Sequence, residues 1–136
     1  MTTNPLALII EDDPKLSLLY DTVLKQSGYE TEIIRRGDEA LARLATVSPV
    51  LILLDIHLPY VSGKEILQHI RADSRLAALP VIVLTADLHI AKSLEEQADH
   101  VLIKSYGVSQ LRNLVVRLRP NDAPAATSAA SPENII

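Results

Sequence analysis

The sequence predicts an α/β fold with a doubly wound, open, five-stranded parallel sheet and helices on both faces. Two observations lead to this prediction. Five short apolar runs alternate with five segments of helical periodicity, which is typical of parallel βαβ units with right-handed crossovers. In addition, the run Val50–Leu54 contains only aliphatic residues, as expected for a central strand that is buried on both faces.

The strands are predicted from short apolar runs that end in polar or turn-forming residues. Leu6–Ile10 and Val50–Leu54 are the two longest runs. Glu30–Ile34 is more polar, so we expect it at an edge of the sheet. Val81–Leu84, which follows a proline, and Val101–Ile103 complete the five predicted strands.

The helices are predicted from apolar stripes with a period of 3.6 residues. The first begins at Asp13 and Pro14, an N-cap followed by a proline at the first helical position, and ends at Gly28. The others begin at Gly37 and Gly63 or span His89–Gln97 and Val108–Arg119. The inward positions are expected to be Leu16, Leu19, Tyr20, Val23, Leu24, Ala40, Leu41, Leu44, Ile66, Leu67, Ile70, Ile90, Leu94, Val108, Leu111, Leu114, Val115 and Leu118.

The composition bounds the domain organisation and excludes several classes of function. With 136 residues, 48% of them hydrophobic, the chain is long enough for one domain with a core. We expect that domain in residues 1–119, followed by a flexible tail or linker in 120–136, where alanine, serine and proline show no apolar period. We recognise no output domain after it, so the chain either acts alone on a partner or ends within a linker.

A net charge of −4 argues against a general nucleic-acid surface, and 3% aromatic residues argue against a platform that stacks bases. No apolar stretch approaches the roughly 18 residues of a membrane span, so no membrane insertion is expected. The absence of cysteine excludes disulfides and thiolate metal sites and is compatible with a cytoplasmic location.

Polar side chains stand where four of the predicted strands end. Glu11 and Asp12 follow the first strand, Asp55 the third, Thr85 the fourth and Lys104 the fifth. Because parallel strands end at the same edge of the sheet, these residues are expected to converge. Three carboxylates would repel one another unless a hard cation such as Mg²⁺ binds them, and a lysine with a hydroxyl suits a phosphoryl group. Asp55 is the best candidate nucleophile, because a carboxylate can form an aspartyl phosphate.

Each of these residues also has a simpler interpretation. Glu11 and Asp12 could form a solvated acidic turn, and Asp55 could cap the loop that follows it. Lys104 could be a surface lysine, and Thr85 an ordinary strand residue. Their joint occurrence at the strand ends favours a phosphoryl site over these separate interpretations.

With these motifs in order, the chain from about Leu6 to Arg119 resembles the receiver domain of two-component response regulators. The matching pieces are Ile9-Ile10-Glu11-Asp12-Asp13-Pro14, Leu53-Leu54-Asp55-Ile56-His57-Leu58-Pro59 with Gly63, Leu84-Thr85-Ala86, and Ile103-Lys104. The resemblance implies the flavodoxin-like strand order 2-1-3-4-5. It also implies that the protein is a phosphoacceptor that assists its own phosphorylation and dephosphorylation, not an enzyme with a separate substrate.

For the metal site, the resemblance implies that Asp12, Asp55 and the backbone carbonyl of His57 bind Mg²⁺ directly. Glu11 is then expected to act mainly through water. The phosphoryl group would come from a sensor histidine kinase or a phosphotransfer protein. The downstream partner would be a protein target or a C-terminal output domain.

For the phosphoryl group, the resemblance implies that Thr85, Lys104 and the backbone of Ala86 hold its oxygens. Phosphorylation then draws the threonine inward and changes the surface formed by the fourth helix, fifth strand and fifth helix. Two departures from the family bear on this switch. Val101 stands where the family usually has an aromatic residue, and Ser105 stands where it usually has a proline after a cis bond.

The stretch from Thr85 to Lys104 is also about one helical turn shorter than usual, so the fourth helix is expected to be short or displaced. A trans Lys104–Ser105 bond would cost ~3 kcal/mol less than a cis bond. We further hypothesise that the side chains of His57 and Asp87 border the phosphate and tune its access to water.

Three other classes of function fit the sequence less well. A haloacid-dehalogenase-like phosphatase also places an aspartate on a doubly wound sheet, but it requires an aspartate where this chain has His57. A flavin or nucleotide carrier would need a phosphate-binding loop, and neither a Walker A motif nor a dinucleotide fingerprint occurs. A degenerate receiver that serves only for contacts would lack Asp12, Asp55 or Lys104, and all three are present.

Overall fold

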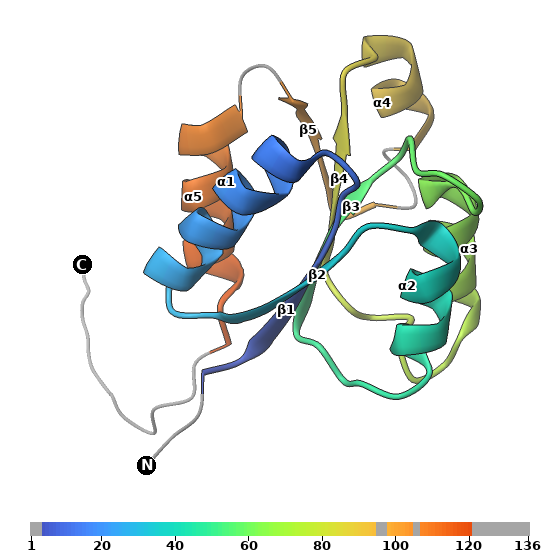
Figure 1. Cartoon of the computed structure of the whole chain (residues 1–136), viewed down its shortest axis with the longest axis horizontal. Coiled ribbons are helices and arrows are strands. Elements are labelled where there is room, and N and C mark those ends of the chain that lie inside the picture. Colours follow the sequence, from blue (N-terminus) through green and yellow to red (C-terminus); the bar gives the residue numbers. More distant parts are fainter. Residues whose placement is uncertain (1–3, 95–97, 105–106, 121–136) are drawn as a thin grey trace.

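The structure, a computed structural model, describes residues 4–94, 98–104 and 107–120. Its strands form one parallel sheet in the order β2-β1-β3-β4-β5, which confirms the predicted architecture (Figure 1). The strands are β1 Leu6–Ile10, β2 Glu30–Ile34, β3 Leu51–Asp55, β4 Val81–Thr85 and β5 His100–Ile103. As predicted, the more polar β2 lies at an edge and the aliphatic β3 at the centre.

The helices are α1 Pro14–Gln26, α2 Gly37–Leu44, α3 Gly63–Ala72, α4 Leu88–Leu94 and α5 Gly107–Leu118. The predicted N-cap of α1 is confirmed, because the Asp13 side chain accepts hydrogen bonds from the backbone of Lys15 and Leu16. The described part of α4 spans seven residues. The predicted continuation of this helix to Gln97, the Lys104–Ser105 bond and the tail from residue 121 lie outside the described residues.

The hydrophobic core has two layers, one on each face of the sheet (Figure 1). α1 and α5 cover one face, and α2, α3 and α4 cover the other. Alternate residues of each central strand point to opposite layers, so that Leu51 and Leu53 pack with α1 and α5 while Ile52 and Leu54 pack with α2 and α3. This burial on both faces explains why the central strands appear in the sequence as continuous aliphatic runs.

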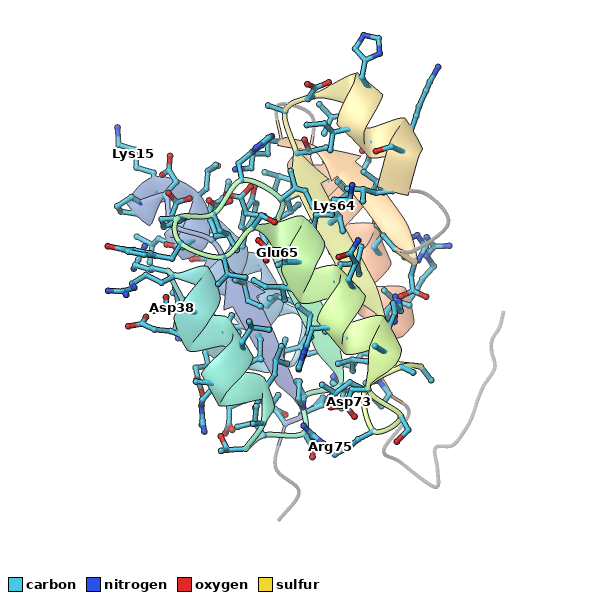
Figure 2. All side chains as sticks on the ribbon, turned by 90° about the vertical axis from the view of Figure 1, so that its right-hand side faces the viewer. Lys15, Asp38, Lys64, Glu65, Asp73 and Arg75 are labelled. Carbon is cyan, nitrogen blue, oxygen red and sulfur yellow. The ribbon has the colours of Figure 1, made fainter. Side chains whose placement is uncertain are left out.

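The first turns of α1, α2 and α3 lie at one end of the molecule, at the carboxyl edge of the sheet. In Figure 2, Lys15 and Lys64 lie in the upper half of the molecule, and Asp73 and Arg75 lie at its lower end. Residues that follow the strands therefore gather among the helix starts.

The structure corrects several details of the predicted elements. Asp55 and Thr85 are the last residues of β3 and β4 rather than the residues after them, because both still pair with the neighbouring strand. Leu19 and Val108 were predicted to face inward, but they are 38% and 39% exposed. On α1 the buried position is taken by Ser17, whose hydroxyl donates to the Pro14 carbonyl oxygen. This bond satisfies the serine within the helix, so a polar residue can occupy the inner face.

Candidate functional site

The strand register brings the candidate residues to the same level of the carboxyl edge. In the pairing of β1 with β3, Ile10 lies opposite Leu54, so Glu11 comes level with Asp55. At the far side of the sheet, Lys104 directly follows the last paired residue of β5. The topology therefore accounts for the convergence of residues that are far apart in the sequence.

Three carboxylates form the centre of the site. One oxygen from each of Glu11, Asp12 and Asp55 lies within 4.8 Å of the others. Glu11 is fully buried and Asp55 is 1% exposed, whereas Asp12 is exposed. Burial, reinforced by the hydrogen bond and the charge of Asp55, raises the pKa of Glu11 to about 7. Ionisation of Glu11 in this buried cluster therefore costs free energy.

Lys104 supplies the compensating positive charge from β5. Its Nζ atom lies 3.1 Å from Glu11 Oε1 and 3.2 Å from Asp55 Oδ1. Burial alone would lower the pKa of Lys104, but the charges of Asp55 and Glu11 raise it above its ordinary value. The lysine thus stays charged and bridges the first and third strands of the chain.

Thr85 lies beside this group and is fully buried. Its Oγ1 atom accepts a hydrogen bond of 3.1 Å from the backbone N–H of Asp87, a bond that does not use the hydroxyl proton. The Asp87 carboxylate accepts from the backbone N–H groups of His89 and Ile90 and so caps α4. Ala86, which lies between Thr85 and Asp87 in the sequence, is exposed.

The loop between β3 and α3 folds closely over the end of β3. The backbone N–H of His57 donates to Asp55 Oδ1 at 3.0 Å and orients the carboxylate, while the His57 side chain is exposed. Gly63 donates to the carbonyl oxygen of Ile56, and a Cβ atom at Gly63 would lie 2.3 Å from the Asp55 carbonyl oxygen. Only glycine fits at this approach of two backbone segments.

The part of the β3–α3 loop around Tyr60 contacts the start of α2. The Arg36 guanidinium lies 4.0 Å from the centre of the Tyr60 ring, and its Nε and NH2 atoms donate to Asp38. Tyr60 has a φ of 73°, an uncommon conformation for an aromatic residue. The Gly37 backbone N–H also donates to the Pro59 carbonyl oxygen. The loop that follows β3 is thus held against the start of α2.

The carboxylates fit a hard divalent cation. All three offer oxygen ligands, which Mg²⁺ and related cations prefer. Glu11 Oε1 is buried and accepts no hydrogen bond, although the Lys104 Nζ atom lies 3.1 Å from it. The hydrogen bond from Lys104, which is 3.5 Å long, goes to Glu11 Oε2. A buried carboxylate oxygen of this kind is able to accept a further positive ligand or an ordered water.

The structure brings together Glu11, Asp12, Asp55, Thr85 and Lys104 as the sequence predicted, and their chemical roles stay predictions. Two features were missed. The N–H contact from His57 to the carboxylate is one, since the sequence led us to expect roles only for the carbonyl and the side chain of His57. The other is the buried Tyr20, whose position in an apolar stripe gave no sign that its hydroxyl would be left without a partner.

Comparison with known proteins agrees with the resemblance seen in the sequence motifs. A family model described as the response regulator receiver domain matches residues 7–116. The DNA-binding response regulator MtrA of Mycolicibacterium smegmatis is 35% identical over 123 residues, which covers 87% of this chain and 53% of MtrA. The chain therefore spans about half the length of the curated relatives that it matches.

Solved structures agree with the sequence matches. The Mn²⁺-bound form of response regulator Rcp1 superposes with a TM-score of 0.71 at 32% identity and covers 84% of this chain and 91% of its own. The phosphorylated cyanobacterial phytochrome response regulator RcpA gives a TM-score of 0.71 at 31% identity, and the match covers 85% of this chain and 91% of RcpA.

Within the described residues, no helix combines the length and apolar character needed to cross a membrane.

Proposed function

The chain belongs to the response regulator receiver domain family, and we propose that Asp55 is the residue that accepts the phosphoryl group. The observation that carries this proposal is the setting of the Asp55 carboxylate. It is 1% exposed at the end of the central strand, oriented by the backbone of His57 and 3.2 Å from the Lys104 ammonium. A carboxylate held beside a fixed positive charge suits attack on a phosphorus atom.

We propose Mg²⁺ as the cofactor, held by Asp12, Asp55 and the His57 carbonyl, with Glu11 acting mainly through water. The clustered oxygens of the three carboxylates support a divalent cation, and the related Rcp1 has been solved in a Mn²⁺-bound form. The bound ion would neutralise charge on the carboxylates and on the incoming phosphoryl oxygens.

In the proposed reaction, an oxygen of Asp55 attacks the phosphorus of a phosphohistidine on a sensor kinase or phosphotransfer protein. A phosphorus–oxygen bond forms, the phosphorus–nitrogen bond breaks, and the leaving imidazole takes up a proton. The Lys104 ammonium and the Thr85 hydroxyl stabilise the transferred oxygens together with the backbone of Ala86. The related RcpA, solved in a phosphorylated form, supports a receiver of this architecture as a phosphoacceptor.

The output is proposed to follow from movement of Thr85 toward the phosphoryl group. The Thr85 hydroxyl accepts from Asp87, the cap of α4, so such a movement would act directly on the start of that helix. The partner would be a cytoplasmic protein target or an output domain of the same protein. MtrA is a DNA-binding response regulator about twice as long as the matched region, which supports the second possibility.

The proposal is tested by incubating the protein with a small phosphodonor and Mg²⁺. We expect one acid-stable, base-labile phosphate per chain in the wild type and none in Asp55→Asn. Asp73→Asn serves as the control, because Asp73 lies at the opposite end of the molecule (Figure 2). Phosphate that persists in Asp55→Asn would refute the assignment of the acceptor.

The hypothesis that His57 and Asp87 tune the lifetime of the aspartyl phosphate is consistent with their positions. The His57 side chain is exposed next to Asp55, and Asp87 is exposed next to Thr85. We expect His57→Ala and Asp87→Ala to change the rate at which the phosphate is lost. Unchanged lifetimes in both variants would contradict the hypothesis.

A further inference from the structure

Two buried side-chain atoms in the described part of the chain have no hydrogen-bond partner, although one of them is in an ion pair with Lys104. One is the acceptor Glu11 Oε1 and the other is the donor Tyr20 Oη. Buried polar groups in native proteins are almost always satisfied, by protein or by ordered water. Glu11 Oε1 faces the Lys104 ammonium at 3.1 Å, but a carboxylate oxygen can accept from a second donor, so the unpaired tyrosine hydroxyl suggests a shared partner.

The position of Tyr20 on α1 supports this connection. Long side chains on a helix extend toward its N-terminus, and α1 begins only three residues after Glu11. Tyr20 is 4% exposed and packs in the layer between α1, α5 and the sheet. Burial raises the pKa of Tyr20 above its ordinary value, and among the charges that raise it further the largest effect comes from Glu11, followed by Asp55. The hydroxyl thus lies within the electrostatic reach of the acidic cluster.

Other buried hydroxyls in the same layer are paired. Tyr29 donates to the Val115 carbonyl oxygen at 2.6 Å. Ser17, on the same helix as Tyr20, donates to Pro14 and accepts from Arg35. Phenylalanine would fill the space of Tyr20 without burying a polar atom, so the hydroxyl needs an explanation other than packing.

We propose that Tyr20 is a positioning residue for the cation site, whose hydroxyl holds Glu11 Oε1 through one buried water. A water with partners on both groups would satisfy the donor and the acceptor together. The carboxylate would then be held in one orientation, with Oε2 kept by the backbone N–H of Asp13. This inference rests on the cation site of the proposed function and assigns to it a residue outside the acidic cluster.

The test is calorimetric titration with Mg²⁺ at pH 8, where Glu11 is ionised. Tyr20→Phe removes only the hydroxyl, and we expect the Kd for Mg²⁺ to rise about tenfold, the low end of the effects of groups that orient metal ligands. Tyr29→Phe is the matched control, because it removes a buried hydroxyl from the same layer. It should lower the melting temperature and leave the Kd unchanged. In a Glu11→Gln background, Tyr20→Phe should no longer change the Kd.

The outcomes separate this inference from the proposed function. If the wild type binds Mg²⁺ and Tyr20→Phe keeps the wild-type Kd while melting at a higher temperature, the hydroxyl is only an unpaired group in the core and the inference is wrong. A tenfold effect that persists in the Glu11→Gln background would also overturn it. A wild type that does not bind Mg²⁺ at all would overturn the cation site and the inference together.

Discussion

The β1–β3 half of the carboxyl edge and its β4–β5 half contribute to the site in different ways. The first, which we call the acidic half, supplies Glu11, Asp12 and Asp55 from strands whose ends are buried on both faces. The second, the gripping half, supplies Thr85 and Lys104. It consists of the buried strand β4, the helix α4 and the four-residue strand β5, of which only one residue is buried.

The difference indicates which half stays fixed and which is able to move. Local opening costs less free energy where fewer apolar side chains are buried. The acidic half is fixed by both core layers and by the close approach of Gly63 to Asp55. The gripping half is joined to it by the Lys104 ion pairs and so is placed to respond to a change of charge on Asp55.

The largest expected effect comes from disturbing the acidic half at Gly63. Gly63→Ala puts a Cβ atom 2.3 Å from the Asp55 carbonyl oxygen and 2.6 Å from the Ile56 Cα atom, so the backbone must shift. We expect the free energy of unfolding to fall by about 3 kcal/mol. Chemical denaturation measures this.

Lys64→Ala is the control for Gly63→Ala, since Lys64 is the next residue and its side chain is exposed. It should change the free energy of unfolding by less than about 0.5 kcal/mol. A Gly63→Ala protein as stable as Lys64→Ala would show that the loop after β3 is not held as tightly as its geometry indicates.

The next prediction concerns the connection between the two halves. Lys104→Met leaves Glu11 and Asp55 buried without the ammonium, so without Mg²⁺ at neutral pH the free energy of unfolding should fall by about 3 kcal/mol. Because a divalent cation would replace the lost charge, millimolar Mg²⁺ should restore more stability to this variant than to the wild type.

Lys25→Met provides the comparison for Lys104→Met. It breaks the Lys25–Asp21 ion pair on α1, in which the lysine side chain is 62% exposed, and should cost no more than about 0.5 kcal/mol with or without Mg²⁺. An equal response of the two variants to Mg²⁺ would count against a cation site at the carboxyl edge.

The pH dependence of stability isolates the acidic half. The pKa of Glu11 is raised to about 7 in the folded protein, above its ordinary value of 4.5. The folded state therefore binds the proton more tightly. The resulting stability is fully present below pH 4.5 and is lost as the pH rises through 7, by up to about 3 kcal/mol.

This loss should be visible in denaturation curves recorded with a chelator between pH 5 and 8. Glu11→Gln should remove most of it, whereas Glu65→Gln, at the exposed start of α3, should not. A wild-type stability that stays constant or rises over this range would contradict the raised pKa.

Comparison of the two halves also explains how much the sequence could predict. Strands buried on both faces appear as aliphatic runs, and the parallel order then brings Glu11, Asp55 and Lys104 to one edge. Contacts between side chains of different elements were not predictable in this way. Tyr60 adopts a positive φ that its residue type disfavours. Tyr20 belongs to an apolar stripe, a pattern that predicts burial but does not indicate that its hydroxyl has no partner.

The smallest expected effect compares the helix caps of the two halves. Asp13 caps α1 beside the acidic cluster, and Asp87 caps α4 beside Thr85, each by accepting two backbone N–H groups. Asp13→Ala and Asp87→Ala should each lower the free energy of unfolding by about 1 kcal/mol. Asp87→Ala should also change the lifetime of the aspartyl phosphate more than Asp13→Ala does, because the carboxylate that it removes holds the start of α4 beside Thr85.

Denaturation and loss of phosphate are measured on the same preparations of the two variants. Their matched loss of stability makes Asp13→Ala a control for a general weakening of the fold. If phosphate loss changes equally in both, the effect comes from stability and not from the gripping half. If it changes only in Asp87→Ala, the cap of α4 and the Thr85 hydroxyl act together. The helix α4 would then take part in the response to phosphorylation at Asp55.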